Sequence, residues 1–311
     1  MTTYVGVDVG GGGIRIRVSV GGEELSAEEP GPVPRRSGHV DTQAVAARIG
    51  RLAAGMCASV DRVAVGLTGM PGLLEDPKEL AEQVHRFVRT TSVVVASDAL
   101  TTHLGALAGR PGCVVAAGTG VIALGTDHET TWRQADGWGH LLGDEGSGAW
   151  IGREALQAAL RHRDGRDGGS ELLLDKLLTR FGDTDALLRT VYGSPSPAHE
   201  LAAFAPLAAD AAHENDPVAA GIWSRAGTHL AASAHAAARA LPPEFSWGGR
   251  LFDAGPLLLD PFRAELTRRR PSALVREPAG QAVDGALLLA RRGLPPEHPH
   301  PPEYAVELRR P

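Results

Sequence analysis

The sequence contains little cysteine. Only two of its 311 residues are cysteines, Cys57 and Cys113, and they form no CxxC pair. Disulfide frameworks and structural zinc sites need several closely spaced cysteines, so we expect neither. Scarce cysteine is typical of proteins from a reducing compartment, and we therefore expect a cytoplasmic protein.

The chain also lacks an excess of positive charge and a long apolar segment. Its 31 Lys and Arg residues are outnumbered by 37 Asp and Glu residues, which gives a net charge of -6. This balance gives no reason to expect nucleic acid or an anionic membrane as a partner. No apolar run approaches the roughly 20 residues of a membrane span, and residues 1–8 lack the basic and apolar regions of a signal peptide.

Glycine, in contrast, is abundant, with 39 residues. The segment over 137–150, GWGHLLGDEGSGAW, combines glycines with an Asp-Glu pair and a serine, directly before a predicted helix over 151–160. Glycines let a backbone approach a ligand closely, and the start of a helix offers free N–H groups to anions. This loop therefore predicts a site for a polar, phosphate-related ligand.

Two strand–glycine loop–strand units predict a duplicated α/β fold. Strands over 4–9 and 14–20 flank Gly10–Gly13, and strands over 113–117 and 121–125 flank Gly118–Gly120. The other expected elements are buried strands over 62–67 and 92–96, helices over 41–56, 79–88 and 101–108, a mostly helical stretch over 151–239, glycine turns over 246–250 and 253–256, a helix ending the segment 278–291, and an extended or partly ordered tail over 294–311.

Each of the two shorter glycine loops is a candidate phosphate site. The backbone N–H groups of Gly10–Gly13 can wrap phosphates, and Asp8, at the end of the preceding strand, can hold Mg²⁺ through water. The hydroxyl of Thr119 can donate to a phosphate in the second loop. Taken alone, each loop also fits a plain tight turn, in which Thr119 only caps the turn.

Three acidic residues are candidates for chemistry. Asp98 ends a buried strand just before a helix, which fits either an N-cap or a general base that takes a proton from a substrate hydroxyl. Asp144 and Glu145 lie in the 137–150 loop. One of them can bind substrate hydroxyls, and the other can be a first-turn acid favoured by the helix dipole.

Taken in order, these segments resemble the sugar kinase/actin superfamily of ATPases. More closely, they resemble the N-acetylglucosamine kinase branch of the BadF/BadG/BcrA/BcrD-type ATPase family. The matching segments are 8–13 (first phosphate motif), 66–69 (loop after the third strand), 97–99 (first connecting motif), 118–120 (second phosphate motif), 137–147 (sugar-contacting loop), 247–252 (adenosine motif) and 278–290 (second connecting helix). The resemblance covers nearly the whole chain except the tail, and its most specific part is the sugar-contacting loop.

The resemblance implies an α/β fold with two ribonuclease-H-like (actin-like ATPase) domains around a nucleotide and sugar cleft. We expect an N-terminal domain over 1–110, with residues 291–311 packing back on it. A larger C-terminal domain with a helical insertion is expected over 111–290. ATP and Mg²⁺ would bind in the cleft, and sugar binding would close it and exclude water.

The resemblance also implies roles for individual residues. Asp98 would be the catalytic base and contact the sugar, and Asp8 would organise Mg²⁺. Thr68, Gly137 and Asp144 would bind the sugar as well. The nucleotide would be held by residues from three motifs: Gly10, Gly11, Gly12, Gly13, Thr119, Gly120, Gly248 and Gly249.

The chain departs from this family's pattern around the expected sugar. The family usually has an Asn shortly after the second phosphate loop, where this chain has Val121 and Ile122, and another in the earlier loop, which here reads PGPVPR over 30–35. Asp136 stands where the family often has Gly. Its carboxylate can pair with a protonated amine, which would favour free glucosamine, or it is an exposed Asp in a turn.

We therefore predict a sugar kinase that uses ATP to phosphorylate an amino sugar, glucosamine or N-acetylglucosamine, at the 6-hydroxyl. One alternative is a catalytically weak sugar sensor, which predicts loss of the base or the phosphate loops, whereas Asp98, Asp8 and Thr119 are all present. Another is a dehydratase-activating ATPase, which needs cysteines around an iron–sulfur cluster. The expected partners are the amino sugar and ATP, without nucleic acid or membrane, and a homodimer is left open.

Overall fold

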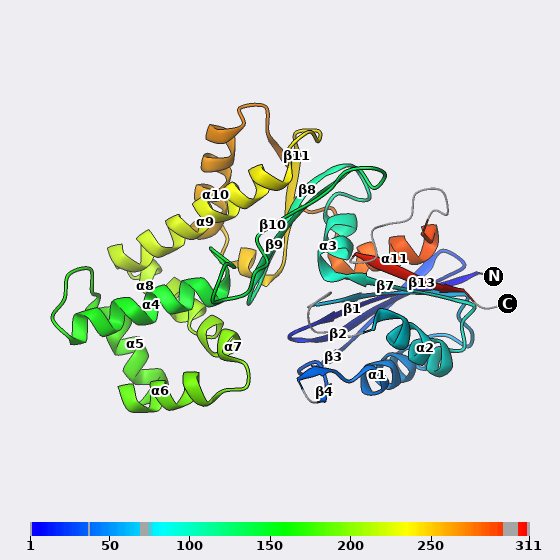
Figure 1. The fold of residues 1–311 in the computed structure, drawn as a ribbon, viewed down its shortest axis with the longest axis horizontal. Coiled ribbons are helices and arrows are strands. Elements are labelled where there is room, and N and C mark those ends of the chain that lie inside the picture. Colours follow the sequence, from blue (N-terminus) through cyan, green and yellow to red (C-terminus); the bar gives the residue numbers. More distant parts are fainter. Residues whose placement is uncertain (1, 37, 69–73, 75, 295–303, 310–311) are drawn as a thin grey trace.

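The computed structural model describes residues 2–36, 38–68, 74, 76–294 and 304–309. It contains two main β-sheets that lie next to each other, with a large group of helices beyond the second sheet (Figure 1). We call the six-stranded sheet with α1–α3 and α11 the first lobe, and the five-stranded sheet with α4–α10 the second lobe. None of the helices among the described residues is long and apolar enough to cross a membrane.

The first sheet has the strand order β13-β7-β6-β1-β2-β3. Its strands are β1 (Thr3–Gly10), β2 (Gly13–Val20), β3 (Glu23–Pro30), β6 (Arg62–Leu67), β7 (Ser92–Ser97) and β13 (Ala305–Arg309). β1, β6 and β7 run parallel, and their Val-rich sequences are buried as expected for strands covered on both faces. β3 was not predicted, because its sequence EELSAEEP is charged and mostly exposed, which is typical of an edge strand.

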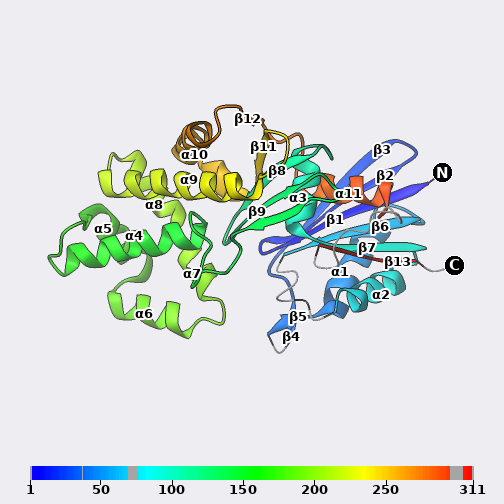
Figure 2. The same ribbon diagram turned by 45° about the horizontal axis from the view of Figure 1, so that its top comes forward.

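Helices cover both faces of the first sheet, with α1 and α2 together on one of them (Figure 2). The helices and small strands of this lobe are β4 (Arg35–Arg36), β5 (His39–Val40), α1 (Thr42–Ala54), α2 (Pro77–Val88), α3 (Asp98–Ala106) and α11 (Ala282–Arg292). Asp41 caps α1 as predicted, because its carboxylate accepts a hydrogen bond from the Ala44 N–H at 3.0 Å. On the other face, α11 packs against β1 and α3.

The crossing of α3 and α11 depends on glycine. A Cβ on Gly285 would lie 1.8 Å from the carbonyl oxygen of Thr101, and a Cβ on Gly105 would lie 2.0 Å from that of Gln281. No side chain fits at either position without moving the backbone, so the two helices touch directly. α3 also contacts β8 and β11 of the second sheet, and it therefore lies between the two lobes.

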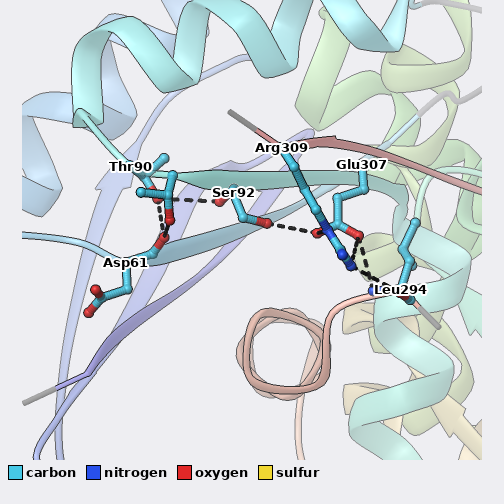
Figure 3. Close-up of polar contacts among 7 residues, drawn as sticks. Asp61, Thr90, Ser92, Leu294, Glu307 and Arg309 are labelled. Atoms are coloured by element: carbon cyan, nitrogen blue, oxygen red, sulfur yellow. Dashed lines mark hydrogen bonds and ion pairs between the residues drawn. The ribbon is translucent and has the colours of Figure 1, made fainter. Parts of the chain in front are cut away.

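The C-terminal strand β13 pairs antiparallel with β7 at the edge of the first sheet. Glu307 connects this strand to its neighbours, because its carboxylate accepts hydrogen bonds from the Ser92 hydroxyl at 2.8 Å and from Nε of Arg309 at 2.7 Å (Figure 3). The N–H of Leu294, just after α11, donates to the same carboxylate at 3.4 Å. The tail predicted to be extended or partly ordered thus contains a hydrogen-bonded strand over residues 305–309.

The second sheet has the order β10-β9-β8-β11-β12. Its strands are β8 (Gly112–Ala117), β9 (Val121–Thr126), β10 (Trp132–Ala135), β11 (Glu244–Gly248) and β12 (Leu274–Val275). β8 and β9 form an antiparallel hairpin, and β11 runs parallel to β8. Residues 246–248, predicted as part of a glycine turn, complete β11 instead, and a 3-10 turn, η1 (Arg250–Ala254), follows.

The helices of the second lobe form a thick layer on this sheet. They are α4 (Gly148–Arg163), α5 (Glu171–Phe181), α6 (Thr184–Gly193), α7 (Pro197–Ala202), α8 (Ala205–His213), α9 (Pro217–Ala237) and α10 (Pro256–Arg269). Many of their buried positions are alanines, and Phe204, Trp223 and Phe262 are fully buried among them. Small side chains let these helices approach closely, while the few large rings fill the remaining space.

Candidate active site

The first glycine loop joins β1 to β2 and presents bare backbone. A Cβ on Gly10 or Gly11 would meet nothing within 4 Å, and Gly11 and Gly12 are exposed. Among the described residues, the N–H groups of Gly11 and Gly12 have no hydrogen-bond acceptor. Unpaired backbone N–H groups at an exposed turn suit an anion such as phosphate.

The second glycine loop, Gly118–Gly120, is held by the start of α4. Gly148 N–H donates to the carbonyl of Gly118 at 2.8 Å, and Ala149 N–H donates to that of Thr119 at 3.0 Å. Ser147 caps α4, because its Oγ accepts from the Trp150 N–H at 3.2 Å. In the part of the chain that the structure describes, no acceptor is found for the N–H groups of Thr119 and Gly120, so this loop matches the first in its chemistry.

Asp8 lies in β1, two residues before the first glycine loop, and is buried. Burial raises the pKa of its carboxyl group, although the Arg15 guanidinium, 3.3 Å away, acts in the opposite direction. The described residues contain no cluster of three or more His, Cys, Asp or Glu side chains that could hold a metal. A Mg²⁺ bound together with nucleotide phosphates needs only one or two carboxylates, so Asp8 beside the open glycine loop fits that role.

Asp98 is the first residue of α3. The N-cap is the preceding Ser97, whose Oγ accepts from the Leu100 N–H at 3.3 Å. The pKa of Asp98 is raised to about 6: burial raises it most, a hydrogen bond from the Thr68 hydroxyl lowers it, and repulsion from Asp8 raises it. The structure thus brings Asp8, Thr68 and Asp98 together at the ends of three neighbouring strands.

Asp136 organises the loop that follows it. It has φ 62°, and its Oδ1 accepts from the N–H groups of Gly137 at 2.8 Å and Asp144 at 2.7 Å. Its Oδ2 accepts from the Glu145 N–H at 3.0 Å. Three backbone hydrogen bonds of this kind hold both ends of the loop in one place, and the carboxylate is directed into its own loop.

Asp144 is buried beside the second glycine loop. A Cβ on Gly120 would lie 2.7 Å from its Oδ2, and its Oδ1 accepts from the Gly139 N–H at 3.3 Å. Burial raises the pKa of Asp144, and the Asp136 carboxylate raises it further. The same loop leaves Trp138 72% exposed, whereas Trp150 in α4 is buried. Of these two tryptophans, only Trp138 can contact a ligand without rearrangement.

The end of β11 and the turn after it pack closely against both lobes. A Cβ on Gly248 would lie 2.3 Å from Cγ2 of Thr102 in α3. One on Gly249, which has φ +92°, would lie 2.1 Å from the carbonyl oxygen of Ala117 in β8. Only glycine fits at either position, which agrees with a turn that a ligand or a second backbone must approach closely.

The expected site residues therefore form two groups. Asp8, Thr68 and Asp98 with the first glycine loop belong to the first lobe. Thr119, Gly120, Gly137 and Asp144 belong to the second, together with Asp136, Gly248 and Gly249. No hydrogen bond or ion pair among the described residues joins the two groups. Sequence reasoning missed Arg15, the partner of Asp8, because an isolated Arg gives no recognisable pattern.

Structural comparison first defines the class of fold. A putative N-acetylglucosamine kinase from Chromobacterium violaceum superimposes with a TM-score of 0.72 and 29% identity, over 93% of this chain and 99% of that one. A ROK family glucokinase from Streptomyces griseus, solved with glucose and AMPPNP, gives a TM-score of 0.63 at 23% identity over 94% and 100% of the two chains. The predicted α/β fold of the actin-like ATPase class is confirmed.

Sequence comparison then identifies the family. Residues 5–290 match the BadF/BadG/BcrA/BcrD ATPase family, and the chain belongs to it. An N-acetylmuramic acid/N-acetylglucosamine kinase from Clostridium acetobutylicum is 27% identical over 225 residues, which are 70% of this chain and 73% of that protein. The predictions of an enzyme of the phosphotransferase class and of ATP use are confirmed at this level.

Proposed function

We propose that this protein transfers the γ-phosphoryl group of ATP to the 6-hydroxyl of an amino sugar. The observation that carries the proposal is Asp98, a carboxylate with a pKa of about 6 next to Thr68 and Asp8, at the edge of an open glycine loop. A base with that pKa is ionised at neutral pH and still basic enough to take a proton from a hydroxyl. The choice of substrate is supported by the names of two relatives, the N-acetylmuramic acid/N-acetylglucosamine kinase and the putative N-acetylglucosamine kinase.

In this proposal each part of the site has one task. Asp98 accepts the proton of the sugar hydroxyl. At the same time the hydroxyl oxygen of the sugar forms a bond to the γ-phosphorus, and the bond between that phosphorus and the ADP oxygen breaks. The free N–H groups of Gly11, Gly12 and Thr119 hold phosphate oxygens. Asp8 would hold Mg²⁺, which neutralises phosphate charge when bound. Asp144 would bind sugar hydroxyls from the second lobe.

Asp136 is the residue at which a preference for glucosamine over N-acetylglucosamine is predicted from the sequence, but its contacts favour a different role. Both of its oxygens already accept backbone hydrogen bonds, so we propose that it acts on the sugar by fixing the loop that carries Asp144. For the Asp136→Gly variant we expect KM to rise about tenfold for both sugars, with an unchanged ratio of their kcat/KM values, because losing hydrogen bonds to a charged acceptor costs this order of free energy. A changed ratio would instead show that the carboxylate meets the substrate amine.

The experiment that tests the function is an assay with radiolabelled ATP across glucose, glucosamine, N-acetylglucosamine and N-acetylmuramic acid, with the product identified by NMR. A 6-phosphorylated amino sugar as the best product supports the proposal. Saturable sugar binding without turnover contradicts it and supports a sensor. An iron–sulfur activator gains no support, because Cys57 follows α1 and Cys113 is buried in β8 of the other lobe. Cytoplasmic location and a homodimer stay predictions.

A further inference from the structure

Arg250 occupies a fixed position at the base of the second glycine loop. It follows Gly249, whose close packing against the carbonyl of Ala117 leaves no room for a side chain. Ala117 is the last residue of β8 and directly precedes Gly118–Gly120. The backbone that carries Arg250 is therefore anchored next to one of the two loops that present unpaired N–H groups.

The side chain of Arg250 reaches the other loop. Its Nη1 lies 3.4 Å from the position that a Cβ on Gly12 would occupy, at the tip of the turn between β1 and β2. Gly12 belongs to the first lobe and Arg250 to the second, so this single side chain spans the two. Because Gly12 has no side chain, the guanidinium can lie directly against the backbone of the loop.

Within the described part of the chain, Arg250 also has no partner for its charge. It is exposed, and it makes no hydrogen bond or ion pair with any residue that the structure describes. Other arginines nearby are engaged: Arg15 pairs with Asp8 and Glu28, and Arg263 pairs with Glu277 and lies over the ring of Trp247. An unpaired guanidinium beside unpaired backbone N–H groups is an arrangement that binds an anion.

We propose that Arg250 binds the β- and γ-phosphates of the nucleoside triphosphate and thereby links the two glycine loops. This inference rests on the proposed function, since it requires the triphosphate to lie on Gly10–Gly13. As the sugar oxygen attacks the γ-phosphorus and the bond to the ADP oxygen breaks, negative charge shifts onto the leaving phosphate oxygen. Arg250 stays protonated throughout and donates N–H bonds to these oxygens, while Asp98 takes the hydroxyl proton.

The test compares nucleotides that differ only in their phosphates. ATP, ADP and AMP are titrated calorimetrically, with Mg²⁺ and without sugar, into the wild type and into the Arg250→Gln, Arg250→Lys and Arg239→Gln variants. Arg239 is the matched control, because it is an exposed arginine beyond the end of α9 and outside the site. For Arg250→Gln we expect the Kd for ATP to rise about 10- to 100-fold, because charge-assisted hydrogen bonds to the β- and γ-phosphates are lost. The Kd for AMP should stay unchanged, because AMP lacks these phosphates.

Each outcome supports or overturns the proposal. Partial recovery of ATP binding in Arg250→Lys and unchanged binding in Arg239→Gln support it. An unchanged Kd for ATP in Arg250→Gln overturns it. An equal loss of affinity for ATP and AMP also overturns it, because it would mean that Arg250 only supports the turn expected to contact adenosine. In either of these cases sugar phosphorylation by the wild type leaves the proposed function standing. A wild type that binds no ATP would overturn both.

Discussion

The two lobes contain the same unit and use it differently. In each, an antiparallel hairpin closes on a glycine loop, β1/β2 in one and β8/β9 in the other, and a parallel strand lies beside it. The first lobe adds Asp8 and Asp98 beside each other and a tightly packed helix pair. The second adds a layer of Ala-rich helices and an open loop fixed by Asp136. Under the proposed function, the shared unit would bind phosphate, while the proton chemistry would belong to the first lobe and sugar recognition largely to the second.

The sharpest way to break this comparison is to remove the proposed base, Asp98, from the first lobe. We expect Asp98→Asn to lower kcat about 10²-fold or more, because a positioned general base contributes at least this factor. The same change should raise the melting temperature, since ionising a carboxyl whose pKa is about 6 in the folded state and 3.8 in the unfolded state costs the folded state at most about 3 kcal/mol at neutral pH.

The control for this prediction is Asp167→Asn, in an exposed loop after α4. Initial rates and thermal unfolding of the three proteins measure both effects. A loss of turnover well under 10²-fold in Asp98→Asn would show that another group takes the proton.

A second comparison uses matched glycines in the helices of the two lobes. Gly285→Ala in α11 places a Cβ 1.8 Å from the carbonyl oxygen of Thr101, so we expect it to lower the free energy of unfolding by about 3 kcal/mol. Gly221→Ala in α9 meets only the end of the Arg225 side chain at 3.8 Å, and we expect a gain of up to about 1 kcal/mol from helix propensity. Urea unfolding measures both. Equal effects would mean that α3 and α11 do not pack as closely as described.

The pH dependence of kcat/KM should follow the ionisation of Asp98 in the first lobe. Asp98 must be ionised to accept a proton, so we expect kcat/KM to fall about tenfold per pH unit below a pKa of about 6. The profile should be level between pH 7 and 8. If the rate of the wild type were independent of pH between 5 and 7, Asp98 would not be the titrating base.

The smallest effect should come from the edge of the first sheet. Burial alone would raise the pKa of Glu307, but its hydrogen bonds with Arg309 and Ser92 lower it overall, so its contribution to stability is present at neutral pH and is lost as pH falls through its folded-state pKa. We expect Glu307→Gln to cost about 1 kcal/mol in urea unfolding at pH 7. Glu23→Gln, at the start of the exposed strand β3 at the opposite edge, should change nothing.

The parts of the fold that could be predicted from the sequence are those that short-range sequence patterns determine. The alternation of Val in β1 and the Asp41 cap of α1 are visible in the sequence, and so are the two glycine loops. β3 was missed because its charged sequence carries no hydrophobic alternation, and only pairing with β2 makes it a strand. The segment 305–309 is too short to identify without knowing that β7 has an open edge.

The site residues also divide into those that their position in the sequence marks and those that only the folded chain brings together. Asp8 lies near the end of a strand, Asp98 directly follows one and Thr119 stands in a glycine loop, so their positions in the sequence already mark them. Arg250 is marked only in three dimensions, because the approach of its guanidinium to Gly12 joins residues that lie far apart in the chain. The hydrogen bonds of Asp136 to its own loop also become visible only in the folded chain.

The pairing of β13 with β7 also bears on how the protein is made. β7 emerges from the ribosome long before residues 305–309 do, because the whole second lobe is synthesised in between. Until the last strand emerges, β7 keeps an unpaired edge of the kind that promotes association between chains. The lobe that is translated first is therefore the one completed last, and chaperone dependence during synthesis should concentrate on it.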